Sequence, residues 1–248
     1  MPSDTSTEPS PLFGSRMAGA LWLIVILASI VIVIGGPSLD MRGDPGTLAA
    51  NVLASASKIR LTFVILFFGK VCYLGFTVLL YELLKPVNKS VALFGAFCGL
   101  AGLLSGAAGS INVVTALSLL EEARRATEPV ANQLKAAAKI FLGTVPGFSG
   151  EDVFFGFQIV SVGYLILRSY FVPRAIGVLL VLGGLSFLIT SFTTVVSPVL
   201  GARLTPLILP IAVLGEGSLA LWLLLRGVNV EQWRSTIARR GAINPAAR

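Results

Sequence analysis

The chain has 248 residues, of which 55% are hydrophobic and only 12% are charged. A soluble globular domain carries about a quarter charged residues, so this composition excludes a water-soluble globule, a disordered chain and a nucleic-acid-binding domain, even though Lys and Arg outnumber Asp and Glu by 19 to 12. It predicts an integral membrane protein.

The N-terminal region combines a polar stretch with a long apolar run. Residues 1–15 are rich in Pro, Ser and Thr, and we expect them to form a disordered tail. The run 17–36 is long enough to span a bilayer, which takes about 20 residues. A secretory signal has a basic first region and a small-residue cleavage site, and 17–36 has neither. We therefore expect a retained transmembrane helix.

Five further apolar runs have spanning length, and Gly or Pro ends most of them. They are predicted as helices over 59–84, 91–118, 150–171, 174–196 and 204–226. The longer connections 37–58 and 119–149 each contain a short amphipathic segment, the first of them over 45–57. Residues 227–248 form a basic, polar tail. The predicted fold is all-α, an integral membrane bundle of six transmembrane helices.

The distribution of Lys and Arg predicts how this bundle, which occupies 16–226, is oriented. If the N-terminus is cytoplasmic, the cytoplasmic segments hold ten bases and four acids, and the outer segments hold eight bases and seven acids. Cytoplasmic loops of membrane proteins carry the excess of Lys and Arg. We therefore expect both termini in the cytoplasm.

Glycines recur at alternating spacings of four and three along the helix predicted over 91–118. They are Gly95, Gly99, Gly102, Gly106 and Gly109. Small residues on one face let helices approach closely in lipid, so we expect the neighbouring helices to pack tightly on this face. The alternative is a glycine face that lines a cavity.

Two ionisable residues fall near the centres of predicted helices, where a charge costs at least about 2.5–3.5 kcal/mol. Lys70 lies eleven residues into 59–84, and Glu216 lies twelve residues into 204–226. Both are therefore about 17–18 Å below the outer helix ends, and we expect them to face each other or to share a hydrated pocket. The pair is either a structural ion pair or a site that couples to a proton, an ion or a ligand. A protonated Glu216 or a neutral Lys70 is the remaining interpretation.

Other polar residues fall in the outer half of the predicted bundle. They are Asn112, Glu151, Asp152 and Gln158. Glu151 and Asp152 open the helix 150–171, where carboxylates complement the helix dipole. We expect these residues to line a polar cavity that opens outward, with Lys70 and Glu216 at its floor.

No complete catalytic motif is present. Gly147-Phe148-Ser149-Gly150 matches the GxSG of rhomboid-type proteases, and Glu121-Glu122 matches the paired glutamates of CAAX-processing proteases, but both chemistries need a histidine and the chain has none. Cys72 and Cys98 lie in apolar runs without CxxC spacing and are predicted to be packing residues. We expect no enzymatic activity, no bound metal and no cofactor.

Several short motifs in combination are typical of one family. They are Tyr81-Glu-Leu-Leu-Lys-Pro-Val-Asn88, Phe154-Phe-Gly156, Gly163-Tyr-Leu165, Pro173-Arg-Ala-Ile-Gly-Val-Leu179 and Gly215-Glu-Gly-Ser-Leu-Ala-Leu-Trp-Leu-Leu224. Over roughly 16–233, the chain resembles a bacterial membrane family catalogued as domain of unknown function 4386. The resemblance implies a multi-helix protein of the bacterial inner membrane and implies no activity. It also implies that Glu is common at the position of Glu216, and His at the position of Gln158.

Three classes of function follow from these observations. The first is a small transporter of a solute or ion, coupled through Lys70 and Glu216. The alternative is a sensory, binding or assembly subunit with an exposed contact surface and no transport or catalysis. An intramembrane enzyme is the least supported. The expected partners are the lipid bilayer and a small solute or ion, and nucleic acid is not expected.

Overall fold

The computed structural model describes residues 10–36, 45–143 and 150–243, and all regular structure in these ranges is helical. Its helices are α1 (Pro11–Gly35), α2 (Pro45–Ala54), α3 (Ala56–Leu84), α4 (Lys89–Ala123), α5 (Glu128–Leu142), α6 (Gly150–Arg168), α7 (Arg174–Val196), α8 (Pro198–Leu225) and α9 (Val230–Ile243). The predicted all-α class is therefore confirmed.

Five of the described helices are long and apolar enough to cross a bilayer, namely α1, α3, α4, α6 and α7. The helix α8 makes a sixth span if its segments Pro198–Ile208 and Pro210–Leu225, which meet at 43°, cross as one. Pro206 and Pro210 lie inside α8. Because proline lacks an N–H and clashes with the preceding turn, it kinks a helix at such a place.

Several helix bounds differ from the predicted ones, and side-chain caps explain two of the differences. The helix α1 begins at Pro11 rather than at 17, because the Ser10 hydroxyl accepts from the Phe13 N–H at 3.2 Å and proline suits the first helical turn. Part of the predicted disordered tail is therefore helical, while residues 1–9 lie outside the described ranges. The helix α8 begins at Pro198 rather than at 204, and Ser197 caps it in the same way. A further difference is α9, which occupies much of the predicted polar tail.

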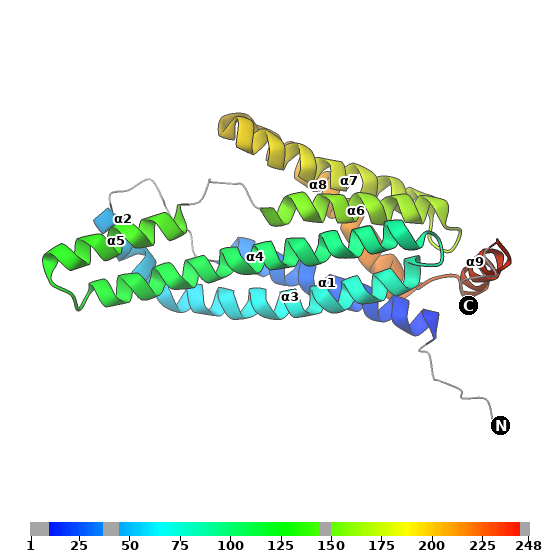
Figure 1. Cartoon of the computed structure of the whole chain (residues 1–248), viewed down its shortest axis with the longest axis horizontal. Helices are drawn as coiled ribbons and strands as arrows, with labels where there is room; N and C mark the ends of the chain where they lie inside the picture. The colour runs from blue at the N-terminus through cyan, green and yellow to red at the C-terminus, as the bar shows by residue number, and fades with distance from the viewer. Residues whose placement is uncertain (1–9, 37–44, 144–149, 244–248) are drawn as a thin grey trace, which may run out of the picture.

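The spanning helices pack in chain order as a closed ring. α1 packs on α3, α3 on α4, α4 on α6, α6 on α7, α7 on α8, and α8 on α1. Figure 1 shows that α6 begins part-way along the much longer α4. The main hydrophobic core draws on all six helices and includes the fully buried Phe76, Ile159, Leu180 and Leu219.

The two ends of the bundle differ. At one end, which we call the terminal end, α1 begins and α8 ends, and α9 lies beside them (Figure 1). There the Val228 N–H donates to the Ser15 hydroxyl at 3.3 Å, and the Trp233 indole N–H donates to the Leu83 carbonyl at 3.0 Å.

At the opposite end, which we call the cap end, α2 and α5 pack on the last turns of α4 around a second core. This core includes Val52, Leu117, Leu120 and Ala138. The helix α4 has 35 residues and is therefore about 52 Å long, whereas the hydrocarbon layer is about 30 Å thick. If α4 crosses upright, part of it therefore extends beyond the hydrocarbon layer.

Glycines bring the backbones of α6 and α7 into contact, which the sequence analysis did not predict. A Cβ on Gly163 would lie 2.8 Å from both the Gly177 carbonyl oxygen and the Val181 nitrogen. A Cβ on Gly184 would lie 2.8 Å from the Gly156 carbonyl oxygen. Such close approach of small residues is how helices associate in lipid.

Candidate functional site

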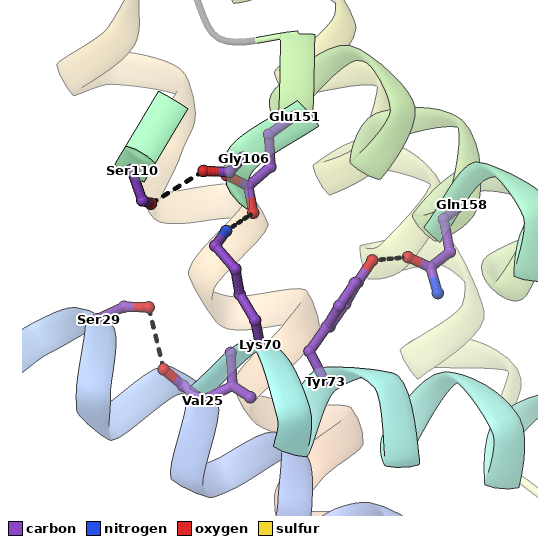
Figure 2. A network of polar contacts seen from close by, with 8 residues as sticks. All are labelled: Val25, Ser29, Lys70, Tyr73, Gly106, Ser110, Glu151 and Gln158. Carbon is purple, nitrogen blue, oxygen red and sulfur yellow. Dashed lines mark hydrogen bonds and ion pairs between the residues drawn. The ribbon is translucent and has the colours of Figure 1, made fainter. Parts of the chain in front are cut away.

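Lys70 forms an ion pair with Glu151 rather than with Glu216, so the predicted pairing was wrong. The Lys70 Nζ donates to Glu151 Oε1 at 3.0 Å, as Figure 2 shows. The Lys70 side chain is 12% exposed and that of Glu151 is 39% exposed. Glu151 lies in the first turn of α6, where the positive end of the helix dipole also favours its negative charge. The pair therefore joins the middle of α3 to the start of α6.

The depths of the two expected partners explain the error. Lys70 lies fourteen residues before Leu84, the last residue of α3, and Glu216 lies nine residues before Leu225, the last residue of α8. Because both helices end at the terminal end, the two Cα atoms lie about 21 Å and about 14 Å from it.

A buried hydrogen-bonded cluster links α3 to α6 about one turn of α3 nearer the terminal end than this ion pair. The Tyr73 hydroxyl donates to the Gln158 side-chain oxygen (Figure 2), and the Gln158 amide donates to the Thr77 hydroxyl at 3.3 Å. The exposed fractions are 1% for Gln158, 6% for Thr77 and 8% for Tyr73. Buried polar groups are normally paired in this way, so the cluster fixes the contact of α6 with α3.

Tyr73 and Thr77 were not among the predicted site residues, although their spacing gives a signal. Lys70, Tyr73 and Thr77 are separated by three and four residues, which places all three on one face of α3. Glu151 and Gln158 are seven residues apart and share one face of α6 in the same way.

The glycine face of α4 leaves the space that the polar side chains of α6 occupy. A Cβ on Gly99 would lie 2.6 Å from the Gln158 amide nitrogen, and one on Gly106 would overlap the Glu151 carboxylate. Cβ atoms on Gly95 and Gly102 would each lie 3.2 Å from atoms of α6, whereas one on Gly109 would have no atom within 4 Å. Four of the five glycines therefore lie against α6.

Glu216 is half-buried on α8 and has no hydrogen bond or ion pair with the described residues. Tyr73 lies close enough to interact electrostatically with both Glu216 and Glu151. The ring of Tyr73 lies 5.7 Å from that of Trp22, whose own ring stacks on Phe76 at 4.6 Å. The ring of Tyr73 therefore lies among aromatic side chains, while its hydroxyl belongs to the polar cluster.

Asn112 and Asp152 are also half-buried, on α4 and α6, and neither hydrogen-bonds to another described residue. Asp152 lies close to the Glu151 carboxylate. Cys72 and Cys98 are buried free thiols. Within the described ranges, no three His, Cys, Asp or Glu side chains gather as metal ligands do. Of the GxSG motif, residues 147–149 lie outside those ranges, and Gly150 begins α6.

Two hollows of the described part of the chain bear on the predicted cavity. One of about 10 Å³ lies between α3, α4 and α6 beside Thr77, Gln158 and Ser161, and the other, of about 410 Å³, lies between α7 and α8 at the terminal end. Neither is lined by Lys70 or Glu216. Neither hollow is therefore the polar cavity that the sequence predicted, with Lys70 and Glu216 at its floor.

The apolar helices define a multi-pass α-helical membrane protein. The chain matches the family described as "Domain of unknown function (DUF4386)" over residues 17–227, and it belongs to this family. The resemblance that the sequence motifs indicated is thus confirmed. No curated protein and no solved structure matches the chain.

Proposed function

We propose that this membrane protein conducts protons, with Glu216 as the group that takes up and releases the proton within the span. Tyr73, Gln158 and the Lys70–Glu151 pair form the polar route from Glu216 toward the cap end. The proposal includes no enzymatic activity. It places both termini in the cytoplasm, on the distribution of Lys and Arg, and the protein in a bacterial inner membrane, on the family resemblance.

The observation that carries the proposal is the position of the Glu216 carboxyl. The Cα atom of Glu216 lies about 14 Å from the end of its helix, and the carboxyl has no hydrogen bond or ion pair with the described residues. An ionised carboxylate without a partner is costly in such a place, and the group neutralises instead. Ionisable residues inside membranes recur in proton relays. Glu216 therefore has the chemistry of a proton acceptor.

The neighbouring groups support a route for protons. Tyr73 is close to both Glu216 and Glu151, and its hydroxyl can both donate and accept. The 10 Å³ hollow beside Thr77, Gln158 and Ser161 has room for about one water molecule. Sites for organic molecules occupy about 300–1,000 Å³, far more than this hollow holds. These features favour a proton over an organic solute.

The test is proton flux in liposomes that contain the full-length protein and a trapped pH-sensitive dye. A potassium gradient with valinomycin supplies the membrane potential. We expect wild-type protein to acidify or alkalinise the lumen according to the sign of the potential, and Glu216→Gln to reduce the flux to the leak of protein-free liposomes. Gln cannot exchange a proton but keeps the size of the side chain.

The matched control is Glu231→Gln, which removes an exposed carboxylate from α9 and should leave the flux unchanged. Equal flux for wild type and Glu216→Gln would overturn the role of Glu216. Wild-type flux no larger than that of protein-free liposomes would overturn proton conduction and favour the alternative, a sensory, binding or assembly subunit.

A further inference from the structure

An open apolar groove runs between α7 and α8 at the terminal end. It has a volume of about 410 Å³ and is lined by Ile176 of α7 and by Ser218, Leu221, Trp222 and Leu225 of α8. Leu221 and Leu225 are 48% and 68% exposed. The groove therefore lies on the outer surface of two adjacent helices.

The groove ends at a cation. Arg226 lines its mouth and is exposed, and it forms no ion pair with the described residues. No carboxylate lines the groove. The charge at the mouth is therefore complementary to an anion.

Arginine–aromatic pairs surround this mouth. The guanidinium of Arg226 lies 6.0 Å from the centre of the Trp222 ring, and that of Arg174, next to the groove residue Pro173, lies 5.2 Å from the Tyr170 ring. Aromatic and basic residues gather where a membrane meets water. The groove thus runs from the headgroup level into the hydrocarbon.

We propose that this groove binds one anionic phospholipid of the adjacent leaflet. An acyl chain lies along Leu221 and Leu225, and the phosphate contacts the guanidinium of Arg226. Basic pockets between transmembrane helices bind anionic headgroups in this way. The groove is lined neither by Glu216 nor by the cluster of Tyr73, Gln158 and Thr77. The lipid proposal therefore does not depend on the proposed proton conduction.

The test is native mass spectrometry of the full-length protein in detergent, with phosphatidylglycerol or phosphatidylethanolamine added at equal concentration. We expect wild type to bind phosphatidylglycerol about tenfold more tightly, because both lipids offer the same phosphate but phosphatidylethanolamine also carries an ammonium, which the guanidinium of Arg226 repels. The variant Arg226→Gln should lose this preference, and Ser218→Leu, which fills the groove, should weaken binding of both lipids. An excess of inorganic phosphate should not displace the lipid, because it has no acyl chain.

The matched control is Arg203→Gln, which removes an exposed arginine from the other end of α8 and should bind lipid as wild type does. Equal binding of the two lipids by wild type, or the same loss for Arg203→Gln as for Arg226→Gln, would overturn the proposal. Displacement by inorganic phosphate would show an anion site without a lipid. Gel filtration separates these outcomes from misfolding, and Ser218→Leu tests the groove independently of the arginine.

Discussion

Replacing Glu151 with glutamine should lower the free energy of unfolding by about 1–3 kcal/mol. The substitution leaves the ammonium of Lys70, on a side chain that is only 12% exposed, without the carboxylate that it contacts at 3.0 Å. Removing one partner of a buried ion pair costs about 3–5 kcal/mol, whereas an exposed pair contributes at most about 1 kcal/mol. Because Lys70 is 12% and Glu151 39% exposed, we expect a cost between these two ranges. Unfolding in mixed micelles by a denaturing detergent measures the difference.

A double substitution separates the ion pair from other effects of Glu151. Lys70→Met combined with Glu151→Gln should recover much of the loss, because the uncompensated charge is then removed. Glu82→Gln breaks the exposed pair of Glu82 with Lys85 and serves as the control, with an expected cost below about 1 kcal/mol. Additive effects of the two substitutions, or coupling of Lys70→Met to Glu216→Gln instead, would contradict the pairing that the structure shows.

Replacing Gly163 with alanine should destabilise the bundle by roughly 1–3 kcal/mol, the usual cost of overpacking. The new Cβ would lie 2.8 Å from the Gly177 carbonyl oxygen and the Val181 nitrogen. Both are backbone atoms of α7, which cannot turn aside as a side chain can, so α6 and α7 must move apart. The same detergent titration measures the loss.

Gly217→Ala is the matched control for this substitution. Gly217 is also helical, but a Cβ there would have no atom within 4 Å. Its replacement should be neutral or should stabilise α8 by up to about 1 kcal/mol, the helix-propensity difference between Gly and Ala. Equal losses for the two variants would show that the close α6–α7 contact contributes nothing.

The sequence predicts where helices begin and end better than it predicts how neighbouring helices are offset along the bundle. The structure has α7 over Arg174–Val196, the range that the flanking prolines 173 and 198 also indicate. By contrast, α6 begins part-way along α4 (Figure 1), and hydropathy alone does not reveal such an offset between neighbouring helices. Glu151 was therefore predicted as a carboxylate that opens a helix, while its contact with Lys70 was missed.

The glycines show the same limit. The spacing of Gly95, Gly99, Gly102 and Gly106 is visible in the sequence, and the structure places all four against α6. The pairs Gly156–Gly163 and Gly177–Gly184 repeat at seven residues in two different helices. Gly163 contacts Gly177, and Gly184 contacts Gly156, only because α6 and α7 are neighbours in the correct register. The sequence of one helix does not show which helix lies beside it. A pattern on one helix predicts a packing face but does not identify the partner.

The infrared carbonyl band of protonated carboxyl groups tests most directly the claim that Glu216 holds a proton within the membrane. We predict that the full-length protein in lipid shows this band at neutral pH and that Glu216→Gln removes intensity from it. Glu231→Gln should leave the band unchanged, because an exposed glutamate is ionised at that pH. A band of the same intensity in wild type and Glu216→Gln would contradict the claim.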